Sequence, residues 1–361
     1  LAVAMMLQVL PMLAFAAEDM PLTKGQAKVV STGIVYGTVL EAVTNAGTVD
    51  TIELGEGNYT LYSIPSAGTT KGKDLTFVGQ GTDKTAWNIG ALVPDPANFG
   101  TEYNGDYSFD GAGTVTFQNM TLRSGSADYL GFIRPDKTVV KDCVINGKTF
   151  YWGYTSAKFE NTTFNAPNGD YAIWTYSSPE MTFDGCTFNA SGKVINVYTD
   201  YSAGKHDITV NFNNCTVNSS SGKTALNIND SNMGSYKYIL NISGSNHVTA
   251  ERDTTTCTQL FGFGGKFNEL FKNSNSGRTE VNIDGKCVWK DGKMQTHAYT
   301  DGEKEQNFTR VEGDWTDKGD HYEREVTTTC NYCGYTTTIT EKGYKLEYDL
   351  NGGEPAEGAD Y

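Results

Sequence analysis

A short pattern recurs along most of this chain, and its unequal spacing constrains the fold more than any other feature. Each copy has an apolar residue, a polar residue, a Phe or its substitute, a turn residue and another apolar residue. The Phe positions are 19 residues apart between Val140 and Phe159 but 30 apart between Phe212 and Ile242. A coil of parallel strands accepts insertions at its corners, whereas leucine-rich and propeller repeats keep their length. The pattern therefore predicts an all-β fold, a right-handed parallel β-helix.

The residue two places after the Phe position is Asn, Asp or Gly in successive copies. Asn and Gly are the residues that most readily accept the left-handed backbone conformation of a sharp corner. We therefore expect a ladder of turns whose Asn side chains hydrogen-bond to their neighbours, as in cross-β stacks. The positions are Asn119, Asp142, Asn161, Gly185, Asn214, Gly244 and Gly285.

Three cysteines, Cys143, Cys186 and Cys215, directly follow this turn position and are expected to point inward. Disulfides are one interpretation, because exported proteins form them. Thr162 lies between Cys143 and Cys186 in the column, so only Cys186 and Cys215 are neighbours. We favour buried free thiols that act as small hydrophobic side chains.

A second strand in each coil carries aromatic and Asn residues at alternate positions. If Ile173, Ile195 and Leu226 face the core, their neighbours along each strand face outward. Trp and Tyr present flat apolar faces to sugars, and Tyr and Asn supply hydrogen bonds. We expect this strip to bind a glycan or a host or cell-surface protein, unless an inserted loop covers the rings. Its predicted residues are Trp152, Tyr154, Trp174, Tyr176, Asn196, Tyr198, Asn227 and Asn229.

The segment before the repeats predicts a short helix at 40–45 and a strand at 51–54. Its Asp-Thr-Ile-x-Leu stretch at 50–54, followed by Gly57 and Tyr59, resembles the opening of pectin-lyase-like β-helix proteins. That resemblance implies the fold but not the activity, because this scaffold hosts lyases, hydrolases, adhesins and stalks.

No catalytic motif of the resembling enzymes is present. Inverting hydrolysis requires an acid and a base carboxylate on either side of the bond, and the paired motifs that supply them are missing. A lyase requires acidic calcium ligands and a basic residue, for which Arg134–Lys137 is the compact candidate and a solvated turn the simpler interpretation. The chain is therefore predicted to be non-catalytic. A polysaccharide lyase or glycoside hydrolase acting on acidic polysaccharide is the alternative, and a purely structural stalk is a third possibility.

Residues 1–17 are apolar, uncharged and end in small residues, which predicts a secretory signal peptide whose charged start is missing. The remaining residues carry 28 Lys and Arg against 43 Asp and Glu, a net charge of −15. Such an acidic chain is not expected to bind nucleic acid or anionic membranes. No later apolar run predicts membrane insertion of the mature domain. We expect a secreted or extracellular protein with its β-helix at 18–293.

Residues 294–343 form a separate, more polar segment that contains Cys330 and Cys333 in a Cys-x-x-Cys-Gly motif. A structural zinc site is one prediction, with His321 and His297 as the further ligands. A disulfide between the two cysteines is an equally good interpretation, and redox catalysis is a weaker third one. The segment resembles Cys-x-x-Cys-Gly-Tyr modules between the domains of Gram-positive surface proteins.

The final segment, 344–361, resembles the start of the Listeria–Bacteroides repeat, a small β-grasp-like module of bacterial surface proteins, through Tyr348–Gly353. That resemblance implies a modular protein with a ligand-binding head. We expect it to be attached to the cell surface or cell wall through a region beyond the chain.

Overall fold

The fold is nearly all β, with one short helix. The computed structural model describes residues 21–59, 69–88, 92–94, 102–104, 109–123, 129–166, 171–176, 178–190, 193–198, 206–219, 226–227, 236–244, 247–252, 255–257, 279–290, 293–294, 308–330 and 336–344. The predicted signal peptide and most of the predicted surface repeat lie outside these ranges. In the described part of the chain, no helix has the length and apolar character needed to cross a membrane.

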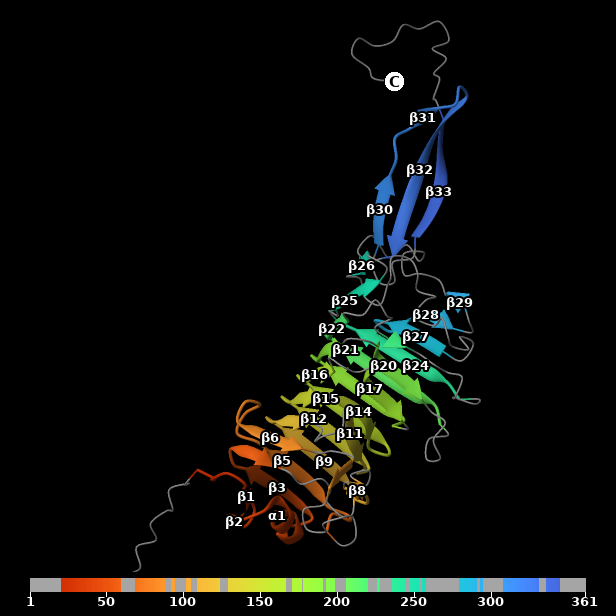
Figure 1. Cartoon of the computed structure of the whole chain (residues 1–361). Helices are drawn as coiled ribbons and strands as arrows, with labels where there is room; N and C mark the ends of the chain where they lie inside the picture. The colour runs from red at the N-terminus through yellow and green to blue at the C-terminus, as the bar shows by residue number, and fades with distance from the viewer. Residues whose placement is uncertain are drawn as a thin grey trace, which may run out of the picture.

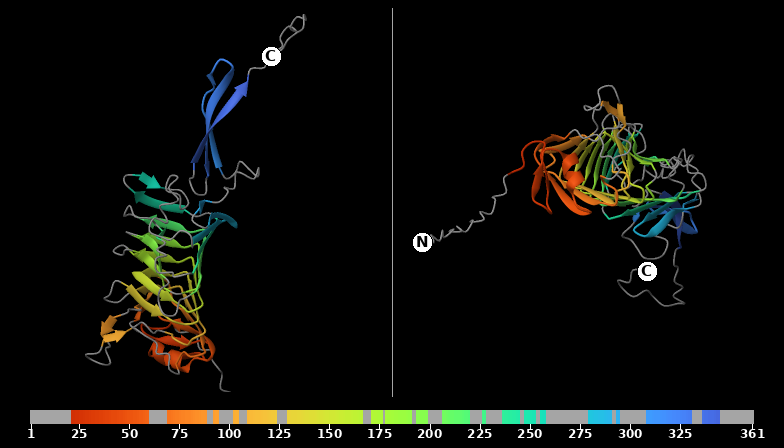
Figure 2. Two further views of the ribbon diagram at one scale, coloured as in Figure 1. Left: turned by 90° about the vertical axis from the view of Figure 1, so that its right-hand side faces the viewer. Right: turned by 90° about the horizontal axis from the view of Figure 1, so that it is seen from below.

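Most strands belong to three mainly parallel stacks, which the chain visits in turn in the coils from β9 to β23 (Figures 1 and 2). The largest sheet contains, in spatial order, β2 (Ile34–Tyr36), β1 (Ala27–Val29), β3 (Val49–Leu54), β5 (Asp74–Val78), β9 (Thr114–Gln118), β12 (Lys137–Lys141), β15 (Ser156–Glu160), β18 (Glu180–Asp184), β21 (Ile208–Asn213), β24 (Tyr238–Ser243), β27 (Thr279–Ile283), β28 (Lys286–Lys290) and β29 (Lys293–Met294).

The other two stacks complete the coil. The second contains β26 (Thr255–Cys257), β25 (His247–Arg252), β22 (Thr216–Ser219), β19 (Thr187–Ala190), β16 (Thr163–Ala166), β13 (Val144–Asn146), β10 (Thr121–Arg123), β6 (Thr85–Asn88) and β4 (Gly57–Tyr59). The third contains β11 (Tyr129–Ile133), β14 (Lys148–Trp152), β17 (Tyr171–Tyr176), β20 (Lys193–Tyr198) and β23 (Leu226–Asn227). Strands β7 (Leu92–Pro94) and β8 (Glu102–Asn104) form a separate pair.

The predicted ladder of turns is confirmed. All seven turn positions have φ between 46° and 77°, in the left-handed region. Asn161 donates to Asp142 at 3.2 Å, as expected of stacked polar side chains. A Cβ atom at Gly185 would lie 2.7 Å from Asn161 Oδ1, so a larger residue here would have to displace the Asn161 side chain. The turns from Asn119 to Gly244 join the largest sheet to the second stack, whereas Gly285 lies in the hairpin between β27 and β28 of the largest sheet.

Stacked aromatic rings fill the interior between the sheets. Phe183 lies between Phe159 and Phe212, with ring centroids 5.1 Å away on each side. Phe164 and Phe188 form a parallel column on the second stack, 4.7 Å apart. These side chains are fully buried. The repeated Phe position is therefore the core of the coil.

The three cysteines of the turn column are buried free thiols, as predicted. Each Sγ donates to the carbonyl of the Phe position one coil earlier; Cys186, for example, bonds Phe159 O at 3.4 Å. Thr162 makes the same contact with Val140 O at 3.3 Å, so threonine substitutes for cysteine in this column. Burial raises the pKa of the Cys143 thiol to about 12.

The described ends of the stacks differ from the coils between them. At the first coil, β1 runs antiparallel to both β2 and β3. At the last, β28 is antiparallel to β27 and β29, and β26 is antiparallel to β25. The helix α1 (Val39–Asn45) packs beside β1, and Lys73 Nζ donates to the carbonyls of Val43 and Ala46 at its C-terminal end.

A second antiparallel sheet follows the coils. It contains β30 (Phe308–Glu312), β31 (Thr316–Asp317), β32 (His321–Cys330) and β33 (Thr336–Tyr344). Its only buried apolar side chain among the described residues is Val326. Ion pairs between Arg324 and both Glu312 and Glu341 join the strands instead.

Candidate functional site

Five residues of the predicted strip share one face of the third stack. Trp174 lies opposite Asn196, and Asn196 lies opposite Asn227. Tyr176 lies opposite Tyr198, two residues further along the same strands. Residues two apart on a strand lie on the same face of the sheet. The backbone register therefore brings these five together, while Asn229 lies outside the described residues.

The side chain of Trp152 is buried, so its predicted outward position is wrong. Its side chain is 1% exposed and lies beside the buried Ile133, with its ring 5.2 Å from that of Phe159. The spacing of 22 residues predicted that Trp152 would pair with Trp174. The structure instead pairs Thr149 with Ile173, 24 residues later, which places Trp152 level with Tyr176. A shift of two residues changes the partner of a strand residue but not its face of the sheet. Trp152 fills the core at the end of β14.

Tyr154 lies at the corner just beyond β14 and is 37% exposed. Its hydroxyl donates to Asp110 Oδ1 at 3.1 Å. Burial raises the pKa of this phenol, and the neighbouring Arg134 guanidinium opposes that rise. Asp110, Arg134 and Tyr154 precede β9, β12 and β15, so three successive coils contribute to one polar cluster. Sequence reasoning missed Asp110, because this residue belongs to no local motif.

The predicted zinc site loses one of its ligands. His321 and Cys330 are the first and last residues of β32. Nine steps along an extended strand separate them by about 30 Å, far more than ligands of one zinc ion allow. Both ring nitrogens of His321 already contact carboxylates, Asp320 Oδ1 at 2.6 Å and Glu323 Oε1 at 2.9 Å. The prediction of His321 as a ligand is therefore wrong.

The remaining predicted ligands do not complete a site among the described residues. Cys333 and His297 lie outside them, and Cys330 is described only through its backbone. Within the described ranges, no group of three or more His, Cys, Asp or Glu residues is placed to hold a metal. A zinc site that uses Cys330, Cys333 and His297 therefore remains a prediction.

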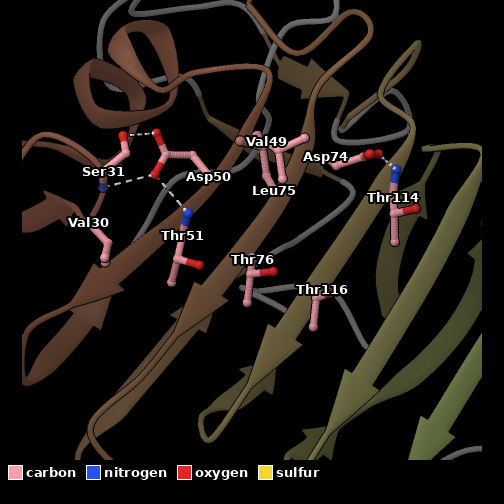
Figure 3. A pocket seen from close by; sticks show the side chains of 10 residues that line it. All are labelled: Val30, Ser31, Val49, Asp50, Thr51, Asp74, Leu75, Thr76, Thr114 and Thr116. Carbon is pink, nitrogen blue, oxygen red and sulfur yellow. Dashed lines mark hydrogen bonds between the residues drawn. The ribbon is translucent and has the colours of Figure 1, made fainter.

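A pocket of about 380 Å³ opens on the outer face of the largest sheet, near the first coils (Figure 3). Strands β3, β5 and β9 form its floor, and the segment after β1 forms one side. Most of its polar lining consists of hydroxyl groups and two carboxylates. The lining residues are Val30, Ser31, Val49, Asp50, Thr51, Asp74, Leu75, Thr76, Thr114 and Thr116.

Three threonines of this pocket stand in register across adjacent strands. Thr51 lies opposite Thr76, and Thr76 lies opposite Thr116. They directly precede Ile52, Phe77 and Phe117, which are buried, so alternation places the threonines on the outer face. Sequence reasoning passed over them, although a threonine before the core position in three early copies was a readable signal.

The same row continues along the whole sheet, and we call it the long row. Beyond the pocket its character changes, since Asn211 donates to Thr182 at 3.1 Å, Asn241 to Asn211 at 2.8 Å and Asn282 to Asn241 at 3.0 Å. The members of the long row are Thr51, Thr76, Thr116, Val139, Lys158, Thr182, Asn211, Asn241 and Asn282.

The two carboxylates of the pocket have different surroundings. Asp50 accepts from the backbone N–H groups of Thr51 and Gly47 at 2.9 and 3.0 Å, and from Ser31 Oγ at 2.6 Å. Burial alone would raise its pKa, but these hydrogen bonds outweigh burial and lower it. Asp74 uses Oδ1 to accept from the Thr114 N–H at 2.6 Å. Asp50 is therefore committed to the fold, whereas Asp74 keeps an oxygen for other contacts.

Comparison with known proteins adds no relative. No protein-family model matches the sequence, and no curated protein or solved structure is significantly similar to it. The resemblances to pectin-lyase-like proteins and to surface-protein repeats therefore rest on the motifs themselves.

Proposed function

We propose that this chain is the non-catalytic, glycan-binding head of a secreted or cell-surface bacterial protein. The head would be a right-handed parallel β-helix of the pectin-lyase-like type. Its acidic charge and the motifs that resemble those of surface proteins support this location. The ligand would be a glycan on another cell or in the surrounding matrix.

The shared register of the third stack carries this proposal. It aligns Trp174 with Asn196 and Asn227, and Tyr176 with Tyr198, on one sheet face. The alternate positions hold Ile173, Ile195 and Leu226, the apolar residues expected to face a core. Aromatic rings beside amides suit sugar recognition, because rings contact C–H groups while amides bond hydroxyls.

The test is a glycan array probed with the full chain and with Trp174→Ala. Losing one buried aromatic contact is worth on the order of 1.5–3 kcal/mol, so we expect binding to weaken at least about tenfold. Trp315→Ala is the matched control, because Trp315 is 45% exposed but belongs to the C-terminal sheet. Unchanged glycan binding by Trp174→Ala would refute the assignment of this strip.

One observation favours a second candidate, a polysaccharide lyase. The corner cluster places a guanidinium, Arg134, beside a phenol, Tyr154, that is itself bonded to Asp110. Elimination from a polyuronide needs a base for the proton next to the carboxylate and a cation to neutralise that carboxylate. Arg134 would supply the cation, and Tyr154 would act as the base after passing its own proton to Asp110.

A panel of polyuronides separates the two candidates. A lyase releases unsaturated sugars, which absorb ultraviolet light, and a hydrolase releases reducing sugars without that absorbance. If the cluster is catalytic, Tyr154→Phe will abolish the absorbance while leaving the fold intact. Absence of both products across the panel would leave binding as the function.

A further inference from the structure

The first three members of the long row differ from the others in having unused hydroxyl groups. In the part of the chain that the structure describes, no hydrogen bond is recorded for the hydroxyls of Thr51, Thr76 and Thr116. Further along, the Asn members of the same row bond to one another. The pocket lies over the unused hydroxyls and not over the bonded amides.

We propose that this pocket is a separate binding site for an uncharged, extended glycan that lies across the strands. Adjacent strands are about 4.8 Å apart, so the row offers one hydroxyl at each such step. This interval is close to the length of one sugar residue in an extended chain. Successive sugars can then meet Thr51, Thr76 and Thr116 in order.

The margins of the pocket also suit a sugar. Val49 is 74% exposed and Val30 is 45% exposed, and both line the pocket. Their methyl groups offer apolar surface to sugar C–H groups. Asp74 stands between them and Thr114, where its carboxylate accepts hydrogen bonds from sugar hydroxyls (Figure 3).

The charge of the pocket selects against acidic glycans. Its lining contains two carboxylates and no Lys or Arg among the described residues. Two nearby cations are engaged elsewhere, Lys28 with Glu53 at 3.5 Å and Lys73 with the helix carbonyls. A uronate would therefore bring a third negative charge into the pocket with no lining cation to meet it. An uncharged glycan avoids this cost.

The experiment measures binding of the full chain to neutral β-linked glucan oligosaccharides and to oligogalacturonate by calorimetry. We expect the neutral oligosaccharides to bind and oligogalacturonate to bind more weakly. Thr76→Val, which keeps the shape of the side chain, should weaken neutral-glucan binding about threefold to tenfold, the value of one neutral hydrogen bond. The triple variant Thr51→Val, Thr76→Val and Thr116→Val should abolish it.

Two controls separate this site from the strip on the third stack. Thr209→Val alters an outer-face threonine of the same sheet outside the pocket and should leave binding unchanged. Trp174→Ala should also leave glucan binding at the pocket unchanged. The variants therefore test the pocket and the strip on the third stack separately. Tighter binding of oligogalacturonate, no binding of the neutral glucans, or full binding by the triple variant would each overturn the proposal.

Discussion

The two ends of the long row share the same sheet face and the same backbone register but use their polar side chains differently. At the first coils, the threonines Thr51, Thr76 and Thr116 line a pocket. At the later coils, Asn211, Asn241 and Asn282 form a ladder of amides. A repeated outer position can thus either stabilise the coil or remain available to a ligand, and side-chain length decides which.

The core beneath the two ends should be energetically alike, and this is the largest effect we predict. Phe77 stacks on Phe117 at 5.8 Å, and Phe183 stacks on Phe159 at 5.1 Å. Phe77→Ala and Phe183→Ala should each lower the free energy of unfolding by about 3–5 kcal/mol, measured by urea denaturation. A large difference between the two losses would mean that the two ends of the long row differ in the core as well as on the outer face.

On the outer face, substitutions at the two ends of the long row should change the free energy of unfolding by different amounts. Asn211→Ala deprives both Thr182 and Asn241 of a hydrogen-bond partner, so we expect a loss of about 1–2 kcal/mol in the free energy of unfolding. Thr76→Val removes no recorded hydrogen bond and should stay within about 0.5 kcal/mol of the wild type. Equal losses in the free energy of unfolding would show that the outer side chains at the two ends contribute alike to stability.

As the pH falls, the first coil should lose protection from amide hydrogen exchange before the later coils do. The pKa of Asp50 is lowered in the folded protein, so its contribution is fully present above the unfolded value of about 3.9. That contribution is lost as the pH falls through the lowered folded value. Amide hydrogen exchange should show protection of β1 and β3 falling below pH 4 before that of β21 and β24. Asp50→Asn should remove this pH dependence, and uniform loss along the coils would contradict it.

The smallest effect should come from replacing the threonines at the first end of the long row by asparagines, as at the second end. Replacing Thr51, Thr76 and Thr116 by Asn offers two new amide hydrogen bonds along the row. We expect a gain of about 0.5–1 kcal/mol in the free energy of unfolding, with loss of neutral-glucan binding. Thermal unfolding and calorimetry measure the two quantities on the same sample. Retained binding would show that the hydroxyls are not the recognition element.

The sequence predicted the elements that local chemistry determines. The turn positions from Asn119 to Gly285, the inward cysteines and the helix near residue 40 follow from residue type and alternation. Trp152 was misplaced because alternation along β14 did not reveal that this side chain lies in the core beside Ile133 and Phe159. His321 was misplaced because a zinc motif says nothing of the long strand between its members.

The candidate sites were harder to predict than the fold. Asp110 meets Tyr154 only because three coils stack, and neither residue's neighbours in the sequence indicate this. The pocket depends on β1 folding back beside β3, which brings Val30 and Ser31 next to Thr51. Contacts between coils therefore create both the Asp110–Tyr154 cluster and the pocket. Sequence motifs within one coil mainly indicate which residues form the core.

The antiparallel strands at the ends of the largest sheet have a consequence for self-association. A stack of parallel coils has no internal reason to stop, and an open edge strand is a template on which another chain can grow. Here β1 and β28 reverse the strand direction next to the coils, and the edges of the sheet are the short strands β2 and β29, of three and two residues. Such short edge strands leave few backbone groups on which another chain can pair, which limits growth of the sheet by self-association.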